Sequence, residues 1–210
     1  MAVTFVTLVA LDAAAFDEAG RVSTQALTTF GIKDDARILD GHLAGLARAG
    51  LVHLSLAHLL VNVTSLAVCA VLLWRLVPLN ERTIKRAAAV AAILVVTSAC
   101  GFLLSFFVRN GLSAGASAGV FGLLGAVPGA LLMRRDLSTP RVRVSLAVLL
   151  FGLGAAAVAV LAGDGAVDHA AHFGGLIAGA VCGLVFGTPV GRVIVGGVAI
   201  GVVVLGFTSA

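Results

Sequence analysis

Long apolar runs separated by short polar segments dominate the chain from residue 51 onward. The runs cover residues 51–77, 87–108, 114–133, 144–162, 169–187 and 190–207. Each is close to the ~20 residues that an α-helix needs to cross the hydrocarbon core of a bilayer. None alternates apolar and polar residues with the period of two that a half-buried β-strand has. The pattern therefore predicts six membrane-spanning helices.

The first 50 residues follow a different pattern. Residues 3–16 are apolar but short for a span, and residues 17–50 form a mixed, partly amphipathic segment with several charges. The apolar stretch lacks a basic start and contains Asp12, so it is not typical of a cleavable signal peptide. We expect a short first span followed by an outer loop.

The composition agrees with a membrane protein and argues against several other classes. The chain is 60% hydrophobic and 11% charged, whereas a soluble domain has about 25% charged residues. Its net charge of +4 comes from residues in short loops between the spans, so nucleic-acid binding is not indicated. The three cysteines lie inside apolar runs without CxxC spacing, which favours neither a disulfide framework nor a zinc site. We expect no metal or cofactor.

The basic residues in the loops predict the orientation of the spans. Two loops are rich in them, with Arg75, Arg82, Lys85 and Arg86 around the first and Arg134, Arg135, Arg141 and Arg143 around the second. The loop at residues 109–111 has one basic residue and the loop at residues 163–168 has none. Because basic loops stay on the cytoplasmic side, the two poor loops are expected to face outward.

Polar side chains gather in the outer parts of three spans that all begin on the outer side. His53, His58 and Asn62 lie in the first of the six runs, Ser117 in the third and His172 in the fifth. Polar groups inside spans are costly and are candidates for function. His58 and Asn62 are four residues apart, so both can donate hydrogen bonds to one point, as an oxyanion requires. The alternative is that they only bond neighbouring helices together.

Rows of small residues predict close packing between the helix of Ser117 and the helix of His172. Ala118, Gly122, Gly125 and Gly129 form one row, and Gly175, Gly179, Gly183 and Gly187 form the other. If these rows pack against each other, Ser117 and His172 meet near one end of the contact. A serine hydroxyl needs such a base to act as a nucleophile. The alternative is that the glycines only pack helices and that His172 is an interior histidine whose hydrogen bonds are satisfied by its neighbours.

Two other titratable residues lie near His172 in the sequence. Asp168 is expected to cap the helix that begins at residue 169. His169 is a weaker candidate base than His172.

Three motifs occur in a fixed order along the chain. They are His53-x4-His58-x3-Asn62, the run GASAGVFGLLG from Gly115 to Gly125, and AHFGG at 171–175 followed by Gly179. Together they resemble the rhomboid family of intramembrane serine proteases over roughly residues 41–187. The family's usual Trp-Arg pair in the first loop has no counterpart, since Ala44 and Gly45 stand at that offset.

The resemblance implies a fold and a set of roles. It implies a polytopic helical bundle with a six-helix core, here followed by an extra C-terminal span, and a Ser117–His172 dyad. It implies an oxyanion site made by His58, Asn62 and the Ser117 backbone N–H, with Phe121 packed on His172. His53, Gly115, Gly175 and Gly179 are expected to support the site. The predicted division is one membrane domain over residues 1–210, with the first span and outer loop in 1–50, the core in 51–187 and the extra span in 190–207.

The function that follows is cleavage of transmembrane segments of membrane proteins, at a site on the extracytoplasmic side of the cell membrane. The main alternative is a non-catalytic rhomboid-like protein that binds membrane helices. A more distant alternative is a small transporter, which predicts an internal repeat or paired broken helices, and the sequence contains neither. The substrate and the oligomeric state are not indicated by the sequence.

Overall fold

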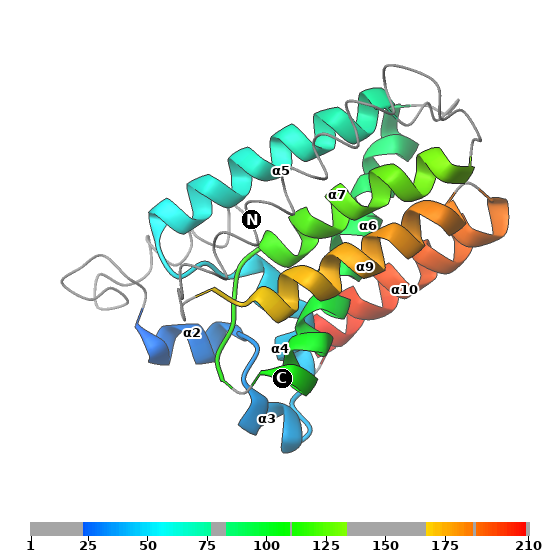
Figure 1. Ribbon diagram of the computed structural model, residues 1–210. Helices are drawn as coiled ribbons and strands as arrows, with labels where there is room; N and C mark the ends of the chain where they lie inside the picture. Colours follow the sequence, from blue (N-terminus) through cyan, green and yellow to red (C-terminus); the bar gives the residue numbers. More distant parts are fainter. Residues whose placement is uncertain (1–22, 77–82, 110, 134–166, 187, 209–210) are drawn as a thin grey trace.

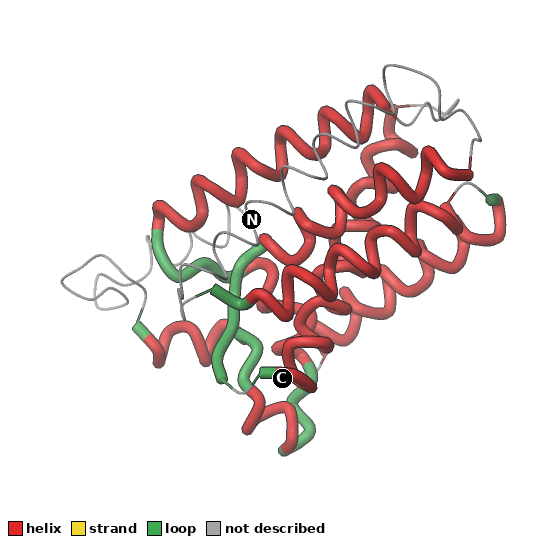
Figure 2. The backbone as a smooth tube through the Cα atoms, viewed as in Figure 1, coloured by secondary structure: helices red, strands yellow, loops and turns green. Residues whose placement is uncertain are grey.

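The regular structure is helical. The computed structural model describes residues 23–76, 83–109, 111–133, 167–186 and 188–208 (Figure 1). In these ranges Figure 2 draws only helices and the loops between them, and the one β-type pairing with both partners described is an isolated bridge between Lys33 and Ser113. The predicted all-α class is confirmed.

Short helices precede a bundle of long ones. The short elements are α2 (Thr24–Phe30), α3 (Asp35–Leu39), α4 (Ala44–Arg48) and the 3-10 turn η2 (Ala49–Leu51). The long helices are α5 (Leu56–Leu76), α6 (Thr83–Val108), α7 (Ser117–Met133), α9 (His169–Phe186) and α10 (Pro189–Thr208). In Figure 1 the short helices gather at the end of the bundle where α7 and α9 begin.

The long helices have the length and apolarity of membrane spans. Ile84–Val108, His169–Phe186 and Pro189–Thr208 are long and apolar enough to cross a bilayer, and Leu56–Val71 and Ser117–Ala130 are shorter apolar helices. On α10, Val193 is 75% exposed and Phe207 is 72% exposed, which suits a surface that faces lipid. The runs predicted at 3–16 and 144–162 lie outside the described residues.

Two predicted span boundaries are wrong for identifiable reasons. The run at 51–77 becomes helical only at Leu56, because the Ser55 hydroxyl accepts the His58 N–H (3.1 Å) and so caps the helix start. His53 therefore lies before the helix and not inside it. The run at 114–133 becomes helical at Ser117, since Gly115 has a φ of +123°, outside the helical region. At the other termini the helices differ from the predictions by a few residues, the most being the start of α6 at Thr83.

The predicted contact between rows of small residues is confirmed. A Cβ atom added to a glycine of α9 would overlap a backbone carbonyl oxygen of α7. The pairs are Gly175 with Ala118, Gly179 with Gly122, and Gly183 with Ala126. Gly125 and Gly129 of α7 meet carbonyl oxygens of α9 in the same way, and Gly187 lies outside the described residues. Only glycine allows the two backbones to approach this closely, so these residues fix how α9 lies on α7.

Candidate active site

Ser117 is the first residue of α7 and points toward α9. Its hydroxyl oxygen lies 2.7 Å from Nε2 of His172, which is on the first turn of α9. The two residues are 55 positions apart in the sequence, and the predicted contact between them is confirmed. Because Ser117 begins the helix, its backbone N–H is among the first four that have no partner within the helix.

Phe121 lies one turn after Ser117 and packs flat on the histidine. The rings of Phe121 and His172 are stacked, with centroids 4.5 Å apart and planes 9° apart. This contact holds the imidazole on the side that faces Ser117. The predicted packing of Phe121 on His172 is confirmed.

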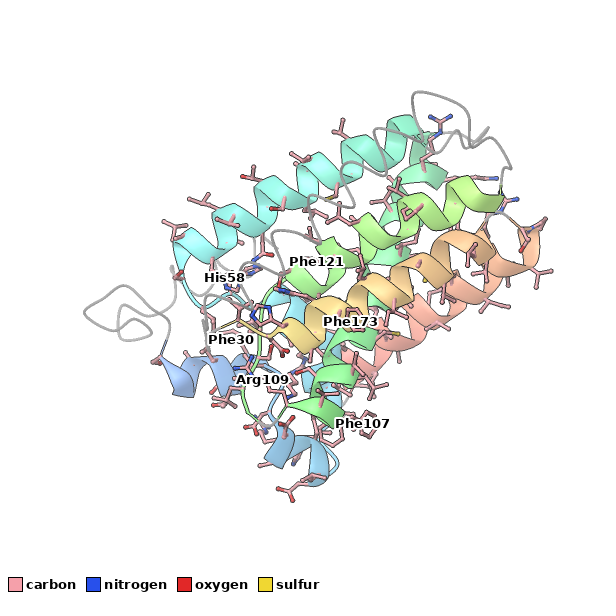
Figure 3. The ribbon with its side chains drawn as sticks, viewed as in Figure 1. Phe30, His58, Phe107, Arg109, Phe121 and Phe173 are labelled. Atoms are coloured by element: carbon pink, nitrogen blue, oxygen red, sulfur yellow. The ribbon has the colours of Figure 1, made fainter. Side chains whose placement is uncertain are left out.

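His58 and Asn62 stand on α5, opposite Ser117. The Asn62 amide Nδ2 donates to the His58 carbonyl oxygen (2.9 Å), and Asn62 is buried. Nδ1 of His58 accepts the Leu54 N–H (3.4 Å), so the proton of the neutral ring is on Nε2. Figure 3 shows His58 and Phe121 directed into the same region of the molecule. His58 and Asn62 lie on the wall of one cavity, and their role as donors to an oxyanion stays a prediction.

Gly115 allows His58 to approach the loop before Ser117. A Cβ at Gly115 would lie 2.6 Å from Cε1 and 2.9 Å from Nε2 of His58, closer than any side chain tolerates. The Gly115 N–H donates to the Ala49 carbonyl (2.9 Å), which ties the loop to η2. Gly115 therefore sets the path of the chain into Ser117.

His53 has a different place from the one predicted. It lies in the extended segment between η2 and α5 and is 1% exposed. Its Nε2 accepts the Ala116 N–H (3.4 Å), and its ring meets that of His58 edge to face, with centroids 5.3 Å apart. His53 thus supports both the loop before Ser117 and the His58 ring, and it makes no contact with the serine itself.

Asp168 caps α9 and does not contact His172 through its carboxylate. Oδ1 accepts the Ala171 N–H (2.9 Å), and Oδ2 accepts the hydroxyl of Ser105 on α6 (2.5 Å). Burial raises the pKa of this carboxyl, but hydrogen bonds from Ser105, Ser113 and the Ala171 N–H, together with the charge of Arg109, outweigh burial and hold the pKa below its ordinary value. The predicted capping role is confirmed.

His169 is the other histidine of α9. Its ring centroid lies 6.1 Å from that of His172, and neither ring nitrogen has a hydrogen-bond partner in the described part of the chain. The geometry therefore gives the contact with Ser117 to His172 and not to His169.

The polar residues line one cavity of 450 Å³. Ser117, His172, His58 and Asn62 are on its wall. Apolar side chains complete it, among them Leu27 of α2, Ile32 after α2 and Leu112 on the connection between α6 and α7. A water molecule occupies about 30 Å³ in the liquid, so the cavity has room for several waters or for an extended peptide segment. Among the described residues, no group of three or more His, Cys, Asp or Glu side chains is placed to hold a metal ion.

Comparison with known proteins gives a family and one relative. The model of the rhomboid domain matches residues 40–189, a range that includes every residue of the cavity wall named above except Leu27 and Ile32. The chain is 27% identical over 173 residues to "Rhomboid protease GluP" of Bacillus subtilis (strain 168), a match that covers 81% of this chain and 31% of the relative. The chain thus spans about a third of the length of that relative. No solved structure gave a significant match. Because the domain model matches most of the chain, the protein belongs to the rhomboid family.

Proposed function

We propose that the protein is an intramembrane serine endopeptidase that cleaves transmembrane segments of other membrane proteins. The observation that carries the proposal is the 2.7 Å contact between the Ser117 hydroxyl and Nε2 of His172 inside a cavity large enough for peptide and water. That distance is within the ~2.6–3.2 Å over which a base can take a proton from a serine. A relative named as a rhomboid protease agrees with this activity.

The reaction follows from the positions of the two side chains. Ser117 Oγ attacks the substrate carbonyl carbon while His172 takes the hydroxyl proton. His172 then gives that proton to the leaving amine as the C–N bond breaks and an acyl-enzyme ester remains. Water in the cavity attacks the ester with His172 again as base, which releases the acid and restores Ser117. Asp168 takes no part in the proton transfers, because its carboxylate is bonded to Ser105 and to the start of α9.

The negative charge of the intermediate has three candidate donors. They are Nε2 of His58, the amide of Asn62 and the backbone N–H of Ser117, all on the wall of one cavity or at its edge. Each lies on a helix whose start is fixed by hydrogen bonds, so the donors need little rearrangement when charge develops. Loss of one such donor costs about 10²–10³-fold in kcat in other serine proteases.

Cleavage of a reporter transmembrane protein tests the proposal. The parent is compared with Ser117→Ala and His172→Ala. Ser98→Ala on α6 serves as the matched serine control, because the Ser98 hydroxyl has no hydrogen-bond partner among the described residues and is not on the cavity wall. The parent and the control are expected to cleave, and the two dyad variants are expected to show no detectable product. Equal cleavage by the parent and Ser117→Ala would contradict the dyad. Binding of the reporter without cleavage by the parent would favour a non-catalytic helix-binding protein.

The active site is proposed to face the extracytoplasmic side of the cell membrane. The support is the scarcity of basic residues in the two short loops at residues 109–111 and 163–168, compared with the loops at the other ends of the same spans. Leu112 is exposed at that end. A Leu112→Cys variant without the three native cysteines should react with a membrane-impermeant thiol reagent added to intact cells. Reaction only after the cells are opened would reverse the orientation.

A further inference from the structure

Lys33 is buried although it carries a charge. It lies between α2 and α3, ahead of the bundle, and is 1% exposed. Lysine is almost never fully buried unless it is paired, because removal of an ammonium group from water is costly. Residue 33 also lies outside the range 40–189 that matches the rhomboid domain. A buried lysine is therefore expected to have specific hydrogen-bond and ion-pair partners.

The partners of Lys33 lie on the connection between α6 and α7. Its Nζ donates to the carbonyl oxygens of Arg109 (2.9 Å) and Gly111 (3.2 Å) and forms an ion pair with Asp35 Oδ1 (2.7 Å). An ammonium group has three donors, and these three acceptors use all of them. The backbone of Lys33 pairs with Ser113 as well, through N–H···O bonds of 2.9 and 3.0 Å.

Asp35, the ion-pair partner of Lys33, also bonds directly to the connection between α6 and α7. Its Oδ2 accepts the Gly111 N–H (2.7 Å). Gly111 is thus held at its carbonyl by Lys33 and at its N–H by Asp35. Gly111 has a φ of +127°, a conformation that L side chains rarely adopt. The residue that Lys33 and Asp35 hold therefore has a backbone conformation that favours glycine.

The segment of residues 111–116 leads directly to Ser117. After Ser113 the chain is fixed by two more hydrogen bonds, Gly115 N–H to Ala49 and Ala116 N–H to His53. Leu112 is 45% exposed, so apolar packing does little to hold the first half of this segment. The charged pair therefore restrains Gly111, and the backbone pairing with Lys33 restrains Ser113. The bonds to Ala49 and His53 restrain residues 115–116.

We propose that Lys33, paired with Asp35, is a positioning residue for the nucleophile, which holds residues 111–116 so that the Ser117 hydroxyl faces His172 and its N–H faces the cavity. This inference rests on the proposed protease function. It assigns to Lys33 and Asp35, which precede the range 40–189 that matches the rhomboid domain, a direct part in the geometry of the reaction. The substrate does not touch Lys33, so its removal should slow the chemical step and leave substrate binding nearly unchanged.

The test uses the whole chain in proteoliposomes and two readouts, of which one reports the position of Ser117 and the other reports the mobility of residues 111–116. Lys33→Met keeps the apolar stem and removes the donors. Asp35→Asn removes the negative charge and turns one of the two oxygens that accept from Lys33 and Gly111 into a donor. Lys85→Met is the control at the far end of α6. The first readout is covalent labelling by a fluorophosphonate. The final level of labelling measures the number of folded active sites, and the rate of labelling reports the position of Ser117.

A displacement of the nucleophile by about 1 Å lowers the reaction rate on the order of 10²-fold. Labelling and substrate turnover should therefore be about 10- to 100-fold slower in Lys33→Met than in the parent. KM should stay within about twofold of the parent value, and the final level of labelling should be unchanged. Asp35→Asn should show a smaller loss of the same kind.

The second readout is amide hydrogen exchange of residues 111–116, which does not depend on activity. Exchange there should quicken in Lys33→Met and remain at the parent rate in Lys85→Met. Parent-like labelling rates in both Lys33→Met and Asp35→Asn would overturn the proposal, as would an activity loss that matches a lower final level of labelling. If Lys33→Met does not fold, Asp35→Asn decides by the same criteria. A parent that neither labels nor cleaves would refute the protease function, whereas unchanged exchange in Lys33→Met would refute the role of Lys33.

Discussion

Substitution of Gly179 by alanine should abolish the proposed protease activity, although Gly179 lies outside the proposed dyad. Gly179 lies on α9 two turns after His172, and a Cβ there would overlap the Gly122 carbonyl oxygen and the atoms bonded to it. Those are backbone atoms within a helix, so they cannot rotate away as a flexible side chain would. The two helices must separate or tilt to make room for the methyl group.

The consequence for the proposed active site can be estimated from the distance between the two groups of the proposed dyad. The Ser117 hydroxyl and His172 Nε2 are 2.7 Å apart, so a separation of about 1 Å takes them beyond the ~3.2 Å reach of a catalytic hydrogen bond. Misplacement of that size lowers the rate on the order of 10²-fold. Overpacking in a close-packed interface also costs about 1–3 kcal/mol of stability.

The assay is turnover of a reporter transmembrane substrate per folded enzyme, together with thermal unfolding in detergent. Gly201→Ala on α10 is the matched control, because a Cβ there has no atom within 4 Å, leaving out its chain neighbours and its own helix backbone. Alanine in place of glycine within a helix is favourable by about 0.5–1 kcal/mol, so the control should be as stable as the parent or slightly more stable, with unchanged kcat. Activity of Gly179→Ala within about threefold of the parent would refute the claim that this glycine sets the distance between Ser117 and His172.

Two further predictions concern the oxyanion site and the cap of α9. Asn62→Ala should lower kcat about 10²–10³-fold with little change in KM, because it removes a donor to the developing charge, and steady-state kinetics would show an effect on KM alone if Asn62 only bound substrate. Asp168→Asn should make stability less dependent on acid pH. The pKa of Asp168 is depressed in the folded state, so its contribution is present above the ordinary carboxyl value near about 4 and is lost as pH falls through the folded value. Thermal midpoints of parent and variant measured from pH 6 downward should converge, and parallel curves would refute this assignment.

The sequence was sufficient to predict the contact between α7 and α9. The glycine rows specify which faces of the two helices approach, and the offsets of Ser117 and His172 from those rows specify which polar residues meet. Small residues at four-residue spacing carry that information because they mark one face of a helix over several turns.

The start of α5 and the place of His53 could not be predicted in the same way. The apolar run begins at Leu51, and apolarity alone does not distinguish a helix from an extended segment at the membrane surface. The boundary is set by a single hydrogen bond from the His58 N–H to the Ser55 hydroxyl. Once the helix begins after His53, that residue is free to reach Ala116 instead of sharing a face with His58 and Asn62.

The contacts of Lys33 and Ser105 also could not be predicted from the residues near them in the sequence. Lys33 reaches the Arg109 carbonyl across 76 residues, and Ser105 reaches Asp168 across 63. Lys33 lies in a mixed segment with several charges, where a lysine is usually solvated. Only the path of the connection between α6 and α7, which brings unsatisfied carbonyls to that place, makes a buried lysine favourable there.

The central claim is that Ser117 is a nucleophile activated by His172. Its most direct test is mass-spectrometric identification of the residue modified by a fluorophosphonate in the folded parent protein, repeated with His172→Ala and with the control Ser98→Ala. We expect modification at Ser117 in the parent and in Ser98→Ala, and none in His172→Ala over the same time. Modification of another serine, or equal labelling of Ser117 with and without His172, would contradict it.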